Sequence, residues 1–312
     1  MFNLFDPRIM WKTHGIIFSI SGHKTNLLNS HTYLPTAIKI DDKIKVFFAA
    51  RDPQNRGRIV SVDFSKELHP KLIKLHKDPI LDLGAKGGFD EDGVSPLSII
   101  KVKEKYYMYY IGWQRSNSVR YFLFTGLAVS SDNCQSFSRI QDTPVIGKSA
   151  NCTQVRSGGC FLYEDTKFKT WYAEQDGSIK INGKETPSYN WSFMESEDGV
   201  NWPDKGIICK KTTSEIFGYG RSAIIKENNT YHAWLSVRTV KEGYKLGYTY
   251  SKDGLNWSEI SFAEDKVVSH KGESCFASII ELENKLLMFY NGANFGQEGI
   301  YFATANSAFC ID

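Results

Sequence analysis

The sequence has no long apolar run and no cluster of basic residues, and each absence excludes a class of protein. No stretch of about 18 apolar residues occurs, so we expect no membrane span. The formal net charge is +3 and no basic run concentrates it, so we expect no nucleic-acid partner. Residues 1–15 lack the basic start and apolar stretch of a signal peptide, so we expect none.

The cysteines and glycines lack the spacing that metal and cofactor sites need. None of the six cysteines forms a C-x-x-C pair or has a histidine at zinc-site spacing, so we expect free thiols and a cytoplasmic location. The glycine-rich segment 84–88 is not followed by the helix that a dinucleotide or phosphate loop requires. No dense Asp/Asn loop suggests calcium. We therefore expect no cofactor and no metal.

Aromatic residues are abundant, and they recur at a regular interval. They make up 14% of the chain, a composition that favours β-strands. Five aromatic, strand-like segments repeat with a period of roughly 60 residues. They are residues 43–51, 105–113, 168–174, 230–238 and 285–292.

Each aromatic segment lies between two further predicted strands. A short apolar strand and a polar turn precede it, as in a β-hairpin. These first strands are predicted at residues 36–40, 97–102, 160–163, 223–225 and 277–282. The third strands are predicted at residues 58–64, 123–131, 191–196, 246–251 and 300–305. Two of them run into Ser-x-Asp-Gly-x-x-Trp turns whose tryptophans, Trp202 and Trp257, should pack back on the sheet.

Five copies of a unit of about four antiparallel strands predict an all-β, five-bladed β-propeller. The alternative is a large β-sandwich, which five in-register copies argue against. No sustained helical period and no linker interrupts the chain, so we expect one domain over residues 1–312.

A propeller would bring polar residues from different blades to one funnel, because the first strand of every blade lines the channel. A ring of five such residues would suit a polar ligand: His31, Asp92, Arg156, Arg221 and Glu273. Asp90 and Tyr219 lie at the same entry points. The alternative is that these residues cap strand ends in solvent or form structural ion pairs.

A second polar group, Arg51, Asp52 and Arg58, brackets the turn after the aromatic strand of the first repeat. The rigid donor fork of arginine suits a carboxylate or phosphate, so these residues are predicted at the pocket rim. The alternative is a solvated hairpin with a surface salt bridge, which contributes little stability.

The blade pattern and the Ser-x-Asp-Gly-x-x-Trp turns resemble the propeller superfamily of arabinanases, levansucrases, invertases and mannoside phosphorylases. A closer resemblance is to bacterial glycosidase-like proteins found with surface-polysaccharide genes. It is carried by Trp11-Lys12, Ser30-His31, Arg51-Asp52, residues 89–96, residues 110–113, Arg221 and Tyr290-Asn291-Gly292. This resemblance implies a carbohydrate ligand and supplies no known reaction.

The chain departs from the glycosidases of that superfamily where their carboxylates stand. Leu34-Pro35 and Ser95-Pro96 occupy the places of two Asp-Pro pairs, and Arg156 stands near the usual glutamate. Catalytic carboxylates would have to be rebuilt from Asp52, Asp92 and Glu273. We favour Asp92 as the acid, because Gly93 lets the backbone approach a ligand closely, and Glu273 is the next choice.

Three functions follow as alternatives. The first is an enzyme that makes or breaks a glycosyl bond of a phosphorylated, nucleotide-linked or acidic sugar by hydrolysis, phosphorolysis or transfer. The second is a plain glycoside hydrolase with rearranged carboxylates. The third is a sugar-binding or scaffold propeller without catalysis. The sequence does not show which proteins, if any, are its partners.

Overall fold

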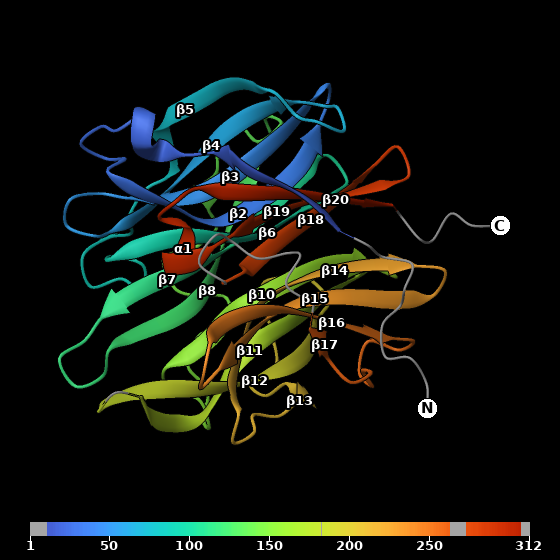
Figure 1. Cartoon of the computed structure of the whole chain (residues 1–312). Coiled ribbons are helices and arrows are strands. Elements are labelled where there is room, and N and C mark those ends of the chain that lie inside the picture. The colour runs from blue at the N-terminus through green and yellow to red at the C-terminus, as the bar shows by residue number, and fades with distance from the viewer. Residues whose placement is uncertain (1–10, 182, 263–272, 307–312) are drawn as a thin grey trace.

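The strands of this chain follow the aromatic repeat. The computed structural model describes residues 11–181, 183–262 and 273–306, and there the protein is almost entirely β (Figure 1). The helical elements described are η1 (Ile20–Gly22) and α1 (Ala293–Gly296). The all-β prediction is confirmed.

Antiparallel pairing arranges the described strands in sets of up to four, each set following one repeat. The strands of the first two repeats are β2 (Ser30–Ile40), β3 (Lys43–Arg51), β4 (Gly57–Ser65), β5 (Leu72–Leu81), β6 (Gly93–Val102), β7 (Lys105–Arg115), β8 (Tyr121–Ser130) and β9 (Ser138–Arg139). Those of the next two are β10 (Val155–Glu164), β11 (Lys167–Ile181), β12 (Lys184–Ser196), β13 (Ile207–Lys210), β14 (Ile216–Glu227), β15 (Thr230–Thr239), β16 (Gly243–Ser251) and β17 (Ser261–Phe262).

The last set combines the two ends of the chain. It holds β18 (Cys275–Leu282), β19 (Lys285–Asn291) and β20 (Ile300–Asn306), and its outer strand is β1 (Lys12–Phe18) from the N-terminal side. This pairing joins segments far apart in the sequence, and the repeat alone did not predict it. It is the reason the last repeat needs no fourth strand of its own.

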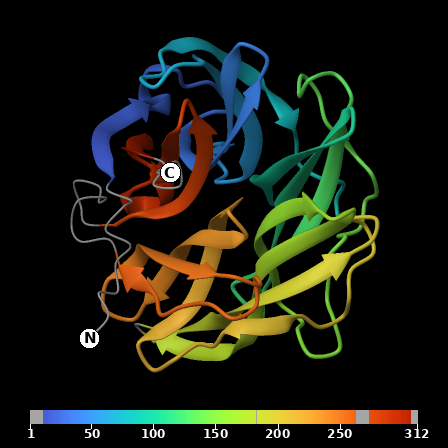
Figure 2. The same ribbon diagram turned by 90° about the vertical axis from the view of Figure 1, so that its right-hand side faces the viewer.

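The sets are arranged around a common centre, as in a propeller, and do not stack as two facing sheets (Figure 2). Short parallel bridges join β4 to β6, β8 to β10 and β12 to β14. The buried amide of Asn291 links the last set to the first, accepting from the backbone N–H of Leu34 at 2.9 Å and donating to the carbonyl of Thr32 at 2.8 Å. The sandwich alternative does not fit this arrangement.

A register shift interrupts the first strand of every repeat near the same level. The shifts lie between Tyr33 and Thr36, Pro96 and Ser98, Ser157 and Cys160, Tyr219 and Ser222, and Cys275 and Ser278. A bulge inserts a residue without a cross-strand partner and re-aims the side chains beside it. The shift therefore changes which side chains of the first strand lie beside the second strand at this point.

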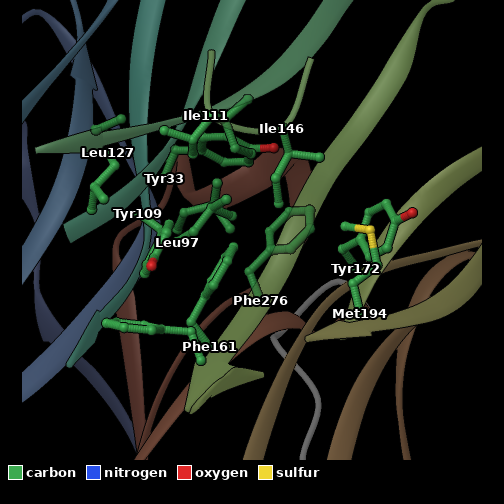
Figure 3. Packing of buried hydrophobic residues seen from close by; sticks show 14 of the residues in the cluster. Tyr33, Leu97, Tyr109, Ile111, Leu127, Ile146, Phe161, Tyr172, Met194 and Phe276 are labelled. Atoms are coloured by element: carbon green, nitrogen blue, oxygen red, sulfur yellow. The ribbon is translucent and has the colours of Figure 1, made fainter. Parts of the chain in front are cut away.

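The core fills the space between the sets with aromatic and aliphatic side chains. One cluster gathers residues from several repeats, among them Leu97, Tyr109, Phe161 and Phe276 (Figure 3). The rings of Tyr109 and Phe161 stack with centroids 3.7 Å apart. This packing joins neighbouring sets through a shared apolar core.

The predicted tryptophan turns pack back on the sheets as expected. Trp257 is buried and Trp202 is half-buried. Each indole N–H donates to the glycine carbonyl of its own turn, Gly254 at 2.9 Å and Gly199 at 3.0 Å. In the part of the chain described, no helix is long and apolar enough to cross a membrane.

Candidate functional site

A cavity of about 440 Å³ opens where the sets meet, a volume within the range of ligand pockets. Residues from every repeat line it. Its charged lining residues are Arg51, Asp92, Arg115, Arg120, Arg221 and Arg238. Its aromatic lining residues are Tyr33, Trp113, Tyr121, Tyr189, Tyr244, Phe276 and Phe295. In the part of the chain that the structure describes, the site therefore combines five arginines with aromatic surface and a single carboxylate.

Strand geometry explains why these residues converge. The second strand of a repeat runs antiparallel to the first, so its last residues lie beside the start of the first strand. Arg51 is paired in this way with Ser30, Trp113 with Gly93, and Arg238 with Gly218. Both the start of one strand and the end of the next thus face the same mouth.

Arg221 lies in the bulge of β14, and it is the charged exception among the bulge residues. The other bulge residues that line the cavity are Leu34, Gly158, Gly220 and Phe276. Only 4% of Arg221 is exposed. We call these bulge residues the floor of the cavity. A charged side chain is expensive to bury without a partner, so the position of Arg221 among them calls for an explanation.

The guanidinium of Arg221 has few partners of its own. Nη1 donates to the carbonyl of Pro35 at 2.7 Å, across the centre from β14 to β2. Nε has no hydrogen-bond partner, and no carboxylate within the described ranges pairs with this arginine. Burial lowers the pKa of Arg221 to about 10, which leaves the side chain charged at neutral pH.

Arg51 and Arg238 contact aromatic rings and polar neutral groups. Arg51 lies 5.7 Å from the ring centroid of Tyr33, and its Nη1 donates to Asn55 Oδ1 at 3.1 Å. Arg238 lies 4.7 Å from the centroid of Phe217, and its Nη1 donates to the hydroxyl of Tyr189 at 3.4 Å. Neither guanidinium is paired with a carboxylate in the described part of the chain.

Two tyrosines near these arginines, Tyr33 and Tyr244, keep their protons at neutral pH. Burial raises the pKa of Tyr33 and of Tyr244 well above the ordinary value. The hydroxyls of Tyr189 and Tyr244 form a hydrogen bond with each other. The neutral hydroxyls of Tyr33 and Tyr244 can donate to a ligand, and they cannot neutralise the arginines.

Within the described ranges Asp92 is the one carboxylate that lines the cavity, and Arg115 holds it. The backbone N–H of Arg115 donates to Asp92 Oδ2 at 2.7 Å, and Arg115 Nε lies 3.9 Å from Oδ1. The side chain of Asp92 remains 23% exposed. It lies immediately before β6, so its position depends on the pairing of β6 with β7.

Asp52 and Arg58 do not line the cavity, although both were predicted at its rim. Asp52 is 3% exposed, and its Oδ2 accepts from Arg58 Nη1 at 2.6 Å and from Arg56 Nε at 2.9 Å. Burial raises the pKa of Asp52, but the hydrogen bonds from Arg56 and Arg58 lower it by more, so it lies below its ordinary value. Arg58 also donates to Asp82 at 2.7 Å. These residues form an ion-pair network inside the hairpin that Arg51 precedes.

Asp90, Arg156 and Tyr219 are also absent from the cavity wall, since each has internal partners. Asp90 Oδ2 accepts from Arg139 Nε at 2.9 Å. Arg156 donates to the carbonyls of Gly147 at 3.1 Å and Pro203 at 2.9 Å, and it lies two residues before its bulge, in register with Glu174. The hydroxyl of Tyr219 donates to the carbonyl of Lys211 at 3.0 Å.

His31 and Glu273 are half-buried beside the cavity but do not line it. His31 Nδ1 lies 2.9 Å from Ser30 Oγ; burial first, and the charge of Arg51 second, lower the pKa of His31 to about 4. Glu273 Oε2 accepts from the backbone N–H of Asn294 at 3.3 Å. Of the predicted ring of five, the cavity wall therefore includes Asp92 and Arg221.

Three lining arginines, Arg115, Arg120 and Arg238, were not predicted as site residues. Arg115 and Arg238 lie near the ends of aromatic second strands, in the position that Arg51 occupies in its own repeat. That shared position was a usable signal. Arg120 lies in the turn before β8, and nothing in the repeat distinguishes it.

No group of three or more His, Cys, Asp or Glu side chains suited to a metal ion occurs among the described residues. The five cysteines in that part of the chain are unpaired, and Cys310 lies outside it.

Comparison with known proteins gives relatives in sequence and in fold. No family model matches the chain. Two uncharacterized proteins from two strains of Mycobacterium tuberculosis are each 27% identical over 297 residues, which covers 93% of this chain and 97% of the relative.

The similar solved structures are glycoside hydrolases of propeller type. One called a glycoside hydrolase has a TM-score of 0.71 at 14% identity, covering 94% of this chain and 91% of its own. A family 117 glycoside hydrolase from Zobellia galactanivorans has a TM-score of 0.68 at 14% identity, covering 97% and 92%. A structure from the GH130 family of mannoside phosphorylases has a TM-score of 0.68 at 15% identity, covering 97% and 96%. The chain therefore shares the fold of these carbohydrate-active families.

Proposed function

We propose that this protein is a carbohydrate-active enzyme that binds an anionic sugar in the arginine-lined cavity and makes or breaks its glycosyl bond. The ligand is a phosphorylated, nucleotide-linked or acidic sugar. The observation that carries the proposal is Arg221, a buried guanidinium at the cavity floor with an unpartnered Nε and no carboxylate partner among the residues the structure describes. The proposal includes a closed five-bladed propeller, a cytoplasmic location and a role in bacterial surface-polysaccharide metabolism.

The charge balance of the wall supports an anionic ligand. A buried charge is tolerated when it is paired and hydrogen-bonded, and Arg51, Arg221 and Arg238 have no carboxylate partner in the described residues. A ligand anion would supply that partner. Arginine forks donate to phosphate or carboxylate oxygens with two parallel N–H groups, and Tyr33 adds a neutral hydroxyl donor.

The fold and the aromatic wall support a sugar. The similar solved structures include glycoside hydrolases and a structure from the GH130 family of mannoside phosphorylases, a family that contains glycoside hydrolases acting on β-1,2 mannosidic linkages. Aromatic side chains present apolar surface beside polar groups, and sugars carry both C–H faces and hydroxyls. A cavity of about 440 Å³ suits a ligand of monosaccharide-phosphate size or somewhat larger.

Among the described residues Asp92 is the one carboxylate that lines the cavity, which favours phosphorolysis or a related transfer over simple hydrolysis. Hydrolysis by glycosidases uses two carboxyl groups about 5–10 Å apart. In phosphorolysis, an oxygen of inorganic phosphate bonds to the anomeric carbon as the bond to the leaving oxygen breaks. We assign Asp92 as the acid that gives its proton to that leaving oxygen. Asp52 and Glu273 are less suited, because neither lines the cavity.

A second candidate is binding without catalysis, and the pairing of Asp92 with Arg115 favours it. A carboxylate held by a backbone N–H and a guanidinium can serve to order the segment between β7 and β8. In that case the same arginines would hold the ligand, and no bond of the ligand would change.

The test combines a binding screen with product analysis. Thermal shift of the wild-type protein against nucleotide sugars, sugar 1-phosphates, uronic acids and matching neutral sugars should give stabilisation by anionic members, because a ligand of the native state raises stability by mass action. Each hit is then incubated with acceptor sugars, the protein is separately incubated with oligosaccharides and inorganic phosphate, and the products are analysed by mass spectrometry. Stabilisation by neutral sugars alone would contradict the proposal, and binding without product favours the second candidate.

A further inference from the structure

Phe295 is held in a strained backbone conformation at the edge of the cavity. Its φ is 56°, and that of the preceding Asn294 is 54°. A bulky residue rarely adopts the left-handed region, and such strain persists only where the surroundings impose it. Strain of this kind concentrates at ligand clamps and active sites, so it marks Phe295 as a candidate for ligand contact.

The ring of Phe295 contacts the cavity wall on one side and remains exposed on the other. It is 39% exposed although it lines the cavity. Its centroid lies 6.2 Å from those of Tyr33 and Tyr244 and 6.3 Å from that of Phe276. These rings fix its orientation, and the strained backbone keeps its apolar surface accessible from the cavity.

Glu273 secures the strained segment. Its Oε2 accepts from the backbone N–H of Asn294 at 3.3 Å. Its Oε1 occupies space beside Gly243, where an added Cβ would lie 2.8 Å from that oxygen. Glu273 therefore lies between the start of β16 and α1, and its carboxylate contacts backbone on the α1 side.

We infer that Phe295 is the platform on which the ring of the sugar stacks, and that Glu273 is a positioning residue that holds this platform. The inference rests on the proposed function, since it assigns the sugar ring and the anion of one ligand to different residues. The exposed face of Phe295 packs against the C–H face of a cyclic sugar, while Arg221 and its neighbours hold the anionic group. Ligands with a ring are thereby distinguished from anions that have none.

The experiment compares anions with and without a sugar ring. Affinities for glucose 1-phosphate, mannose 1-phosphate, glycerol 3-phosphate and inorganic phosphate are measured by calorimetry for the wild type and for the variants Phe295→Ala, Phe295→Tyr and Arg221→Gln. Phe295→Ala should weaken binding of the better sugar phosphate about tenfold, the change given by about 1.4 kcal/mol. The affinities of Phe295→Ala for glycerol 3-phosphate and inorganic phosphate should stay within about twofold of the wild-type values. Phe295→Tyr should keep the wild-type affinity for the sugar phosphate.

The positioning role has its own readout. Glu273→Gln keeps an acceptor for the Asn294 N–H and should retain the wild-type affinity. Glu273→Ala should weaken sugar-phosphate binding, and combining it with Phe295→Ala should add little, because both changes remove the same platform. Full additivity, or failure of Glu273→Gln to rescue, would overturn this role.

The outcomes separate the platform from the proposed function. Equal loss for all anions in Phe295→Ala, or no loss for either sugar phosphate, overturns the platform even if Arg221→Gln abolishes binding and the proposed anion site stands. Failure of the wild type to bind any anion of the wider screen overturns the proposed function, and the platform with it.

Discussion

Replacement of Arg221 by methionine separates a structural arginine from a ligand-binding one. The side chain is 4% exposed, and its Nη1 bond to the carbonyl of Pro35 is lost in the variant. An orphaned buried carbonyl costs about 1–3 kcal/mol, but removal of an unpaired buried charge offsets that loss. We therefore expect Arg221→Met to change the free energy of unfolding by no more than about 2 kcal/mol.

Ligand binding should respond far more strongly than folding. Truncation of one partner of a buried charge pair costs about 2–5 kcal/mol, so affinity for a stabilising anionic sugar should fall at least about 30-fold. Calorimetry measures the affinity, and urea denaturation measures the stability of the same samples. Affinity within about threefold of the wild type would refute the assignment of Arg221 to the anion.

Arg156→Met is the matched control. Arg156 is equally buried, but it lies 3.7 Å from the carboxylate of Glu174 and does not line the cavity. Removal of one member of a buried pair is strongly destabilising, by about 3–5 kcal/mol. The control should therefore lose stability while its remaining folded protein keeps the ligand affinity, which is the reverse of Arg221→Met.

Three further variants test other parts of the account. The pKa of His31 is lowered to about 4 in the folded protein, so as the pH falls from 6.5 to 4 the unfolded chain binds a proton before the folded protein does, and the wild type loses stability. His31→Asn removes this proton uptake, so a profile of melting temperature against pH should fall less steeply over that range. Asparagine tolerates the φ of 65° at this position. Trp257→Ala should cost about 3–5 kcal/mol in urea denaturation, and a loss below about 1 kcal/mol would contradict its role in the core. Asp92→Asn should abolish turnover while ligand affinity stays within several-fold, and undiminished turnover would rule out Asp92 as the acid.

The repeat predicted the strands because aromatic periodicity and turn residues are local signals. All the predicted first strands fall within β2, β6, β10, β14 and β18. The pairing of β1 with β20 was not predicted, since it depends on contacts between distant ends of the chain. The extensions of the first strands toward the cavity were also missed, because bulges and glycines there obscure the alternation of a strand.

The candidate site was predictable in part, for a geometric reason. The sequence placed polar residues at strand starts, which brought Asp92 and Arg221 to the cavity. It could not show which residue of each strand start falls in the bulge. Arg221 does, while Arg156 lies before its bulge and pairs with Glu174. Because successive side chains of a strand point to opposite faces, a shift of one residue along a strand exchanges a cavity position for an internal one.

The central claim is that the anionic group of a sugar is held at the cavity floor, and a crystal structure of the wild-type protein with the best anionic hit of the screen tests it most directly. The account predicts the anion within hydrogen-bond distance, about 3 Å, of the Arg221 guanidinium, with the sugar ring toward Phe295. An anion bound on the outer surface, or a ligand in the cavity whose charged group points away from Arg221 into solvent, would contradict it.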